Sequence, residues 1–236
     1  MFGNIYKNKK VLVTGHTGFK GTWLITWLIN LGAKVVGISK DTPTKPSMFE
    51  ELNLKDKIKH YQENIKDLPK ISEIIANEKP EFLFHLAAQP IVSTSYRDPI
   101  ETISSNIMGT TNILEALRIS NHHCMAIIIT SDKAYDNTEQ VWGYKENDLM
   151  GGKDIYSGSK GAAELIFKSY YHSFFKSAET NVRLAVARAG NVIGGGDWSD
   201  KRIIPDCIKS WSKNKVARLR NPDSTRPWQH VIEAVG

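Results

Sequence analysis

The sequence of 236 residues holds only two cysteines, Cys124 and Cys207, and they lie far apart without the paired spacing of a metal site. Neither a disulfide framework nor a zinc site is supported, so we expect no metal and place both cysteines in the core. His122 and His123 fall in a polar stretch and have no partner at metal-ligand spacing. We therefore expect both histidines to be exposed to solvent.

Long apolar runs are absent as well. The apolar run at residues 126–129 covers far less than a membrane-spanning helix needs, and the first ten residues lack the apolar stretch of a signal peptide. The sequence therefore predicts a cytoplasmic protein with no membrane partner.

Blocks of charge of one sign are also missing. The formal net charge is +6, but the 31 lysines and arginines are spread along the chain. Scattered positive charge fits a nucleotide diphosphate better than a nucleic-acid duplex, and an ordinary solvated surface explains it better still. We expect no nucleic acid as a partner.

Short β-rich runs alternate with segments in which apolar residues recur at helical spacing, and this alternation is typical of a parallel sheet covered by helices. The fold class predicted is α/β, a Rossmann-type doubly wound sheet. The predicted strands are Lys10–Thr14, Lys34–Ser39, Ile58–Gln62, Glu81–Leu86, Met125–Thr130 and Val182–Ala187, and the predicted helices are Phe19–Leu31, Ile103–Ser120 and Ile155–Phe175.

A glycine-rich run, residues 15–21, joins the first predicted strand to the first predicted helix. Backbone N–H groups without side chains in the way can approach a phosphate there, and the helix dipole favours its charge. The G-x-x-G-x-x-G spacing alone is weak evidence, but its position predicts a bound dinucleotide; a structural turn without ligand is the alternative. The predicted contacts are Gly15, Thr17, Gly18, Phe19, Lys20 and Gly21.

Two later strand ends extend the predicted cofactor site. Asp41 follows the second strand, where an acidic residue usually binds the adenosine ribose, but Ser39 or Lys40 is the alternative occupant. Asp41 is equally well explained as a surface turn residue, so NAD and NADP both stay open. The small Ala87 and Ala88 after the fourth strand would let a nicotinamide ribose lie against the backbone, although tight packing explains them equally well.

Tyr156 and Lys160 stand four residues apart on a predicted helix, which puts them on one face. A nearby ammonium favours the phenolate and lowers the pKa of a tyrosine from about 10, which makes a general base for a hydroxyl. Tyr6 and Lys10 have the same spacing where no such role makes sense. The prediction therefore rests on the position of the pair after the fifth strand, because the spacing alone does not distinguish it from Tyr6 and Lys10.

Ser131, Asp132 and Lys133 follow that fifth strand at the carboxyl edge of the sheet, where doubly wound folds bind ligands. A hydroxyl, a carboxyl and an amine could share proton transfers there. A capped turn with Asp132 and Lys133 in solvent is the alternative.

Together these motifs resemble the extended short-chain dehydrogenase/reductase superfamily over nearly the whole chain, and within it the CDP-glucose branch of the nucleotide-sugar 4,6-dehydratases. The resemblance rests on residues 13–24, 130–133, 188–198 and 226–231. The thymidine-linked branch carries Asp-Glu where this chain has Asp132-Lys133, and epimerases usually lack the Asp. Asp132 thus implies dehydration and Lys133 the CDP branch; another nucleotide-sugar dehydratase or a 4-epimerase is the alternative.

The resemblance implies that CDP-glucose loses water to give a CDP-4-dehydro-6-deoxyglucose, for deoxysugar and lipopolysaccharide biosynthesis. Tyr156, aided by Lys160 and Ser131, would take the 4-hydroxyl proton while the C4 hydride passes to NAD. Lys133 would remove the C5 proton and Asp132 would protonate the departing 6-hydroxyl. The hydride would then return to C6. An Asp132–Lys133 ion pair that only orients the substrate is the alternative.

The resemblance also implies binding residues. Asn64 and Ile65 would border the adenine, although an Asp is usual at position 64. A second departure from the family pattern is Ile155, which stands where a proline is typical before the tyrosine. Gln89, Asn191 and Arg226 would bind the nucleotide sugar, the last two at its pyrophosphate; stacking on Trp228 is the alternative for Arg226. The helices 103–120 and 155–175 would form a homodimer or a dimer of dimers.

The composition changes after Gly190: residues 194–197 form a glycine-rich turn cluster, and the later sequence is richer in Trp, Pro and Arg. We expect an NAD(P)-binding domain at 1–190 and part of a substrate domain at 191–236. These roughly 46 residues are too few to close a second core, and the related enzymes continue well beyond this point. The chain is therefore expected to be truncated, and a cofactor-binding fragment without turnover is a further alternative.

Overall fold

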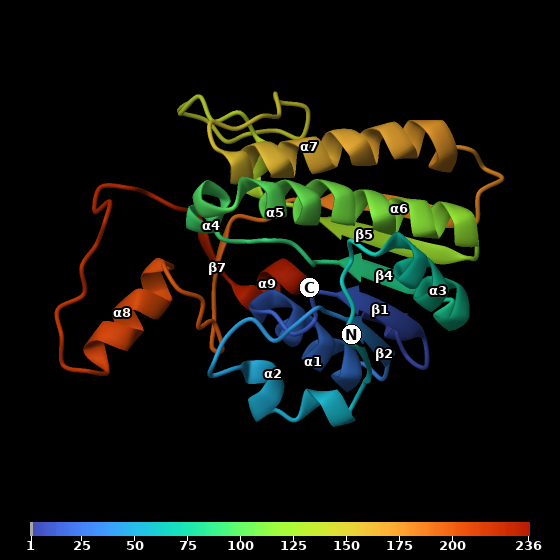
Figure 1. The fold of residues 1–236 in the computed structure, drawn as a ribbon, viewed down its shortest axis with the longest axis horizontal. Coiled ribbons are helices and arrows are strands. Elements are labelled where there is room, and N and C mark those ends of the chain that lie inside the picture. The colour runs from blue at the N-terminus through green and yellow to red at the C-terminus, as the bar shows by residue number, and fades with distance from the viewer. Residues whose placement is uncertain (1) are drawn as a thin grey trace.

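The structure, a computed structural model, describes residues 2–236. Its centre is a six-stranded parallel sheet in the order β3-β2-β1-β4-β5-β6, so the predicted doubly wound fold is confirmed (Figure 1). The chain turns back between β1 and β4, and the crevice for a ligand lies at such a switch point. The strands are β1 (Lys10–Thr14), β2 (Lys34–Ile38), β3 (Lys59–Tyr61), β4 (Phe82–His85), β5 (Cys124–Ile129) and β6 (Val182–Ala187).

Helices cover both faces of this sheet (Figure 1). Successive residues of β1 point to opposite faces: Leu12 packs with the helices α3 (Leu68–Glu78), α6 (Gly109–Ser120) and α7 (Ile155–Tyr170), whereas Val11 and Val13 pack with α1 (Phe19–Asn30). All three side chains are fully buried. A strand buried on both faces reads as a continuous apolar run, which explains the sequence of β1.

The two long predicted helices are each interrupted. The segment predicted as 103–120 consists of α5 (Pro99–Ile103), the π-helical turn η3 (Ser104–Met108) and α6. The segment predicted as 155–175 consists of α7 followed by the π-helical turn η5 (Tyr171–Phe175). The shorter elements are η1 (Phe2–Asn4), α2 (Met48–Glu51), η2 (Leu54–Asp56), α4 (Val92–Arg97) and η4 (Asp132–Ala134).

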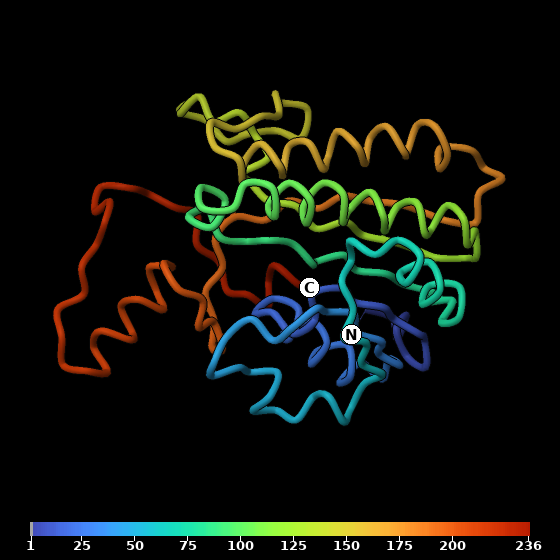
Figure 2. Tube along the Cα trace, viewed as in Figure 1, coloured from blue at the N-terminus to red at the C-terminus, as the bar shows by residue number. Residues whose placement is uncertain are grey.

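Residues 191–236 lie at the carboxyl end of the sheet and then return to it. The strands β7 (Asn191–Ile193) and β8 (Trp228–His230) pair in parallel, and α8 (Ile203–Trp211) lies between them in the chain. Figure 2 shows the long excursion through α8 before the chain comes back. The last helix, α9 (Val231–Val235), packs against α1, and Val231 is fully buried. A domain boundary at residue 190 stays a prediction.

One exposure prediction is wrong. His122 is half-buried because its Nε2 lies 2.9 Å from the carbonyl oxygen of Pro80 and its Nδ1 lies 2.8 Å from Ser120 Oγ. The carbonyl can only accept, so Nε2–H donates to it and the Ser120 hydroxyl donates to Nδ1. His123 is exposed and both cysteines are buried, as predicted.

Across residues 2–236, no helix is long and apolar enough to cross a membrane. The same residues contain no cluster of three or more His, Cys, Asp or Glu side chains that could hold a metal ion.

Candidate active site

A cavity of about 730 Å³ opens at the carboxyl ends of the strands, within the size range of ligand pockets. It lies between the glycine-rich turn and the segments that follow β2, β4 and β5. The predicted site residues that line it are Gly15, Thr17, Gly18, Phe19, Lys20, Gly21, Asn64, Ile65, Ala87, Ala88, Gln89, Ser131, Tyr156 and Lys160. Asp132, Lys133, Asn191 and Arg226 lie outside this lining.

The three glycines of the turn have different tasks. Gly15 has a φ of +73°, and a Cβ there would lie 2.7 Å from Ala87 N; a Cβ on Gly21 would overlap the carbonyl oxygen of Gly15. At Gly18 an added Cβ would meet its nearest atom at an ordinary 3.4 Å. Gly15 and Gly21 are therefore needed for backbone packing, and Gly18 leaves space on the cavity side.

Gly18 is also the N-cap residue of α1, and no side chain of residues 2–236 caps this helix end. The first backbone N–H groups of α1 thus keep their hydrogen-bonding capacity at the cavity wall. Uncapped N–H groups together with the helix dipole favour a negatively charged ligand group at this place.

The floor under the turn is a buried polar cluster. His16 is fully buried, with Nε2 2.8 Å from His60 Nδ1 and Nδ1 3.0 Å from Ser39 Oγ. Burial lowers the pKa of His16 to about 4, so its ring is neutral at neutral pH. Thr17 Oγ1 donates to the carbonyl oxygen of Asp41 at 2.7 Å, which ties the end of β2 to the turn.

The three candidates for the adenosine ribose all line the cavity but differ in what holds them. Ser39 is buried, and its hydroxyl is engaged with His16. Lys40 is exposed and pairs with Glu101 at 3.3 Å. Asp41 is exposed and is held through its main-chain carbonyl alone. The choice among them stays open, as it was from the sequence.

Positive charge is concentrated around the cavity. Lys160 is 7% exposed, and burial, followed by the charge of Lys20, lowers its pKa to about 8. Burial and then the charge of Arg202 lower the pKa of Lys20, while Asp132 and Asp197 oppose this shift. Arg202 pairs with Asp197 at 3.0 Å. Cations that destabilise one another in a buried site favour an anionic ligand.

Tyr156 corrects one expectation. Its pKa is raised above the ordinary value because burial outweighs the lowering effects of the Ser131 hydroxyl and of Arg202. The lowering that we expected from Lys160 is therefore wrong for this structure. Tyr156 and Lys160 do share one helix face and one cavity, as predicted.

The Ser131-Asp132-Lys133 turn is held by short contacts. Ser131 Oγ donates to Asp132 Oδ1 at 2.8 Å and accepts from the backbone N–H of Lys133 at 3.2 Å. The backbone N–H of Asp132 donates to the carbonyl oxygen of Ala189 at 3.2 Å. The turn is thus capped by Ser131, yet the Asp132 and Lys133 side chains are half-buried rather than fully in solvent.

Asn191 and Arg226 come together only through the small sheet. Asn191 on β7 is opposite Trp228 on β8, two residues after Arg226. Arg226 itself is exposed, and its Nη1 donates to the carbonyl oxygen of Thr225 at 2.7 Å. Contacts of Asn191 and Arg226 with a pyrophosphate stay predictions.

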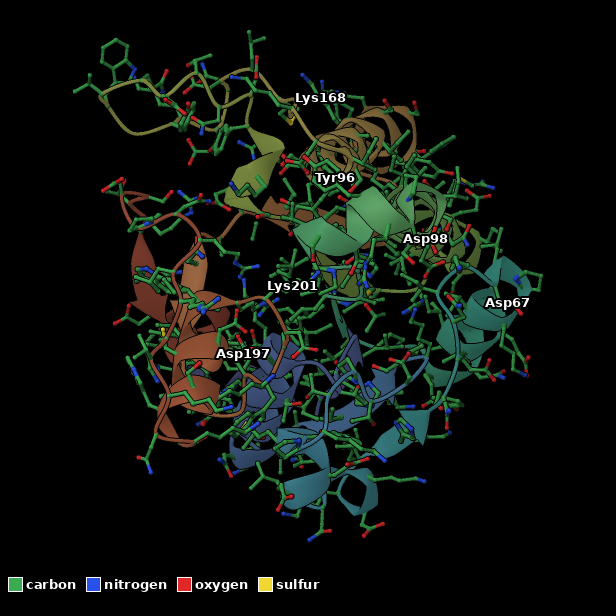
Figure 3. The ribbon with its side chains drawn as sticks, turned by 60° about the vertical axis from the view of Figure 1, so that its left-hand side comes forward. Asp67, Tyr96, Asp98, Lys168, Asp197 and Lys201 are labelled. Carbon is green, nitrogen blue, oxygen red and sulfur yellow. The ribbon has the colours of Figure 1, made fainter. Side chains whose placement is uncertain are left out.

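Two groups of residues were missed by the sequence reasoning. Trp198, Lys201, Arg202 and Lys209 line the cavity from the side of α8. In the view of Figure 3, Lys201 lies between Tyr96 of α4 and Asp197. The sequence signal that could have indicated these residues is the adjacent basic pair 201–202, which lies between a glycine-rich turn and a helix.

Asn106 is the other missed residue. It is 2% exposed on η3, and its Nδ2 donates to the carbonyl oxygen of Gln89 at 3.2 Å and to Ser159 Oγ at 2.9 Å. Its Oδ1 accepts from the backbone N–H of Gln89 at 2.7 Å. A lone amide within a helical pattern gives no signal of this role.

Comparison with known proteins places the chain in a family. The family described as GDP-mannose 4,6 dehydratase matches residues 12–236. The chain belongs to this family. It is 51% identical over 233 residues to the CDP-glucose 4,6-dehydratase of Salmonella typhimurium, a match that covers 98% of this chain and 65% of that protein. The dTDP-D-glucose 4,6-dehydratase of Dictyostelium discoideum is 27% identical, with 96% of this chain and 54% of that protein covered.

Solved structures share the fold. The UDP-glucose 4-epimerase of Thermotoga maritima, solved with UDP-glucose, has a TM-score of 0.82 at 23% identity, with 96% of this chain and 71% of that chain covered. The dTDP-glucose 4,6-dehydratase of Bacillus anthracis, solved with NAD, has a TM-score of 0.79 at 20% identity, with coverages of 96% and 69%. The chain thus spans between 54% and 71% of the length of these relatives.

The different tasks of Gly18 and Gly21 can be tested by alanine substitution. We expect Gly21→Ala to lower the free energy of unfolding by about 2–3 kcal/mol because its methyl overlaps backbone. Gly18→Ala should cost less than about 1 kcal/mol, yet weaken ADP binding by about tenfold, because its methyl stands where a phosphate would approach. Urea unfolding and calorimetric titration with ADP measure the two effects. Equal losses of stability in both variants would contradict this assignment.

Proposed function

We propose that this protein is an NAD-dependent nucleotide-sugar 4,6-dehydratase that acts on CDP-glucose. The observation that carries the proposal is that Ser131, Tyr156 and Lys160 line the same cavity as the glycine-rich turn. The 51% identity to the Salmonella CDP-glucose 4,6-dehydratase supports the substrate, and Asp132-Lys133 supports dehydration over epimerisation. The product would feed deoxysugar and lipopolysaccharide biosynthesis.

The residues present fit a dinucleotide. Its pyrophosphate would lie against Gly18 and the uncapped N–H groups of α1, near the Lys20 ammonium. Asn64 and Ile65 would border the adenine, while Ala87 and Ala88 would border the nicotinamide ribose. When bound, NAD would supply the hydride acceptor needed at C4 and, once reduced, the hydride donor needed at C6. NADP is the other outcome, because Ser39, Lys40 and Asp41 all reach the ribose end of the cavity.

Tyr156 would accept the proton of the sugar 4-hydroxyl. Burial raises its pKa, so the phenolate needs nearby positive charge to form at neutral pH. Arg202 provides such charge in this structure, and the nearby Ser131 hydroxyl also lowers the pKa of Tyr156. Lys160, on the same helix face, would hold the cofactor ribose and add further positive charge.

Asp132 and Lys133 would complete the dehydration. Once C4 is a ketone, the C5 hydrogen is acidic; Lys133 would remove it while Asp132 protonates the leaving 6-hydroxyl. The bonds to Ser131 Oγ and to the Ala189 carbonyl fix the position of Asp132 at the edge of the cavity. A charged Asp132–Lys133 pair that orients the sugar is the alternative role.

A second candidate function is a folded cofactor-binding module without turnover. One observation favours it: Arg226 is exposed rather than lining the cavity. A 4-epimerase acting on another nucleotide sugar is the remaining enzymatic candidate.

A substrate panel separates these candidates. The protein is incubated with NAD and with CDP-, dTDP-, GDP- or UDP-glucose, and product masses are read directly. We expect CDP-glucose to lose the mass of one water, with no net use of NAD, because the hydride is returned. UDP-galactose formed from UDP-glucose would establish the epimerase instead. NAD binding without any product would establish the module.

The same assay tests Lys133. Lys133→Met should reduce turnover of CDP-glucose by at least about a hundredfold, because a general base is lost at C5. Lys145→Met, on the exposed loop before α7, is the matched control and should retain the wild-type rate.

We also propose that the protein is a homodimer, or a dimer of dimers, through the helices α4, α5 and α7. These helices contact one another and expose large apolar side chains: Tyr96 is 71%, Ile100 73% and Leu165 52% exposed. Neighbouring exposed apolar side chains of this size mark protein interfaces, and a second copy supplies the same apolar residues for contact.

Ile100→Asp tests this interface. The variant should shift the protein from dimer to monomer in sedimentation velocity, because a carboxylate would be buried without a partner. Leu149→Asp is the control, since Leu149 is 79% exposed on the loop between β5 and α7. A wild-type monomer, or equal dissociation of both variants, would contradict the proposed interface.

A further inference from the structure

A buried ion pair lies one helical turn beyond Lys160. Glu164 on α7 is 3% exposed, and Arg188, the first residue after β6, is bound to it in the forked manner of a guanidinium. Arg188 Nε lies 2.8 Å from Oε1 and 2.9 Å from Oε2 of Glu164, and Nη2 lies 2.5 Å from Oε2. None of the proposed catalytic steps uses this pair.

A third segment joins the same carboxylate. Thr130 Oγ1 donates to Glu164 Oε1 at 2.5 Å, and Thr130 directly precedes Ser131. One buried side chain thus meets α7, the end of β5 and the end of β6. Each of these segments carries proposed site residues: Tyr156 and Lys160 on α7, residues 131–133 after β5, and Asn191 three residues after Arg188.

Arg188 extends the connection to the loop between β5 and α7. Its guanidinium carbon lies 4.5 Å from the centre of the Tyr135 ring. Nη1 donates to the carbonyl oxygen of Glu146 at 3.3 Å, and Nη2 lies 3.5 Å from Met150 Sδ. The segment 135–150 is therefore attached to β6 through one side chain.

Stability alone is a poor explanation for such a pair. Moving two charges out of water costs several kcal/mol per ion. Well-packed apolar residues in their place often give the same stability or a higher one. A pair that joins three site-bearing segments has a further effect, because the position of each segment then depends on the others. Glu164 also places a negative charge next to Lys160 along the same helix face.

We propose that the buried Glu164–Arg188 pair is a positioning device that locks the ends of β5 and β6 to α7, and that its Glu164 carboxylate supplies a counter-charge for the Lys160 ammonium. This inference rests on the proposed role of Lys160 in the active site. The test of the positioning role needs neither substrate nor turnover. A failure of this role can therefore be distinguished from a failure of the proposed function.

Several ionisable groups face Lys160. Lys20 of α1 and the burial of the site lower its pKa, and Glu164 raises it, with a result of about 8. His85 of β4, whose own pKa burial lowers to about 3, is neutral at neutral pH, as is Tyr156. Removal of the Glu164 charge should therefore lower the pKa of Lys160 further, and the reactive neutral amine should appear at lower pH.

Glu164→Gln tests the counter-charge. Lys160 is labelled briefly with a small amine-selective reagent at a series of pH values, and its peptide is quantified by mass spectrometry. The wild-type midpoint is expected near 8, and Glu164→Gln should move it down by about one pH unit. An unchanged midpoint would overturn the proposal.

Glu78→Gln is the matched control for this measurement. Glu78 is 5% exposed, pairs with Lys10 at 3.0 Å and accepts from Tyr61 Oη at 2.6 Å. Glu78 thus resembles Glu164 in its burial and in its hydrogen bonds. Its partner Lys10, however, begins β1 and lies at the strand ends opposite the cavity. The Lys160 midpoint should stay at the wild-type value in Glu78→Gln, and a shift equal to that of Glu164→Gln would overturn the proposal.

Arg188→Lys tests the connection between segments and keeps the proposal testable if Glu164→Gln does not fold. Lysine keeps the positive charge but cannot reach the carboxylate, the Glu146 carbonyl and the Tyr135 ring together. We expect an unchanged Lys160 midpoint and hydrogen exchange at least about tenfold faster in residues 135–150. Arg118→Lys is the control, because Arg118 forms an exposed forked pair with Glu115 on α6. Unchanged exchange in Arg188→Lys would overturn the proposal.

Discussion

The mutual repulsion of buried positive charges around one cavity is the constraint on which the site depends. Burial and then the charge of Lys20 lower the pKa of Lys160, and burial and then the charge of Arg202 lower the pKa of Lys20. Such charges are costly unless an anion joins them, and the uncapped end of α1 faces the same space. The proposed nucleotide cofactor and nucleotide sugar both carry phosphates that would satisfy this arrangement.

The fold delivers these charges from separate parts of the chain. The parallel sheet brings the ends of β1, β2, β4 and β5 to one edge, and the glycines at 15 and 21 let α1 begin close enough to β4 to form the cavity wall. Buried polar contacts, rather than apolar packing, then hold the site-bearing segments: Asn106 holds Gln89, and Glu164 holds Thr130 and Arg188. The side-chain amide of Asn106 and the carboxylate of Glu164 are hydrogen-bonded at both of their polar atoms, which favours one arrangement of these segments.

Much of this was accessible from the sequence, because local patterns determine it. All six main strands were predicted, and β1 and β6 have the predicted bounds. β1 is buried on both faces and forms an apolar run, whereas alternate residues of β6 are exposed. The strands β7 and β8 were missed, because three-residue strands that pair across 34 intervening residues leave no local pattern. Arg202 and the Glu164–Arg188 pair depend on distances in space. The raised pKa of Tyr156 depends on burial, which its spacing from Lys160 does not reveal.

The central claim is that the hydride removed from the sugar is stored and then returned within one turnover. It is tested most directly with CDP-glucose that carries deuterium at C4, by locating the label in the product by mass spectrometry and NMR. The account predicts a CDP-4-dehydro-6-deoxyglucose that bears the deuterium at C6, with none accumulating in free NADH. Deuterium retained at C4 of a sugar that keeps its oxygen at C6, or lost from the product altogether, would contradict it.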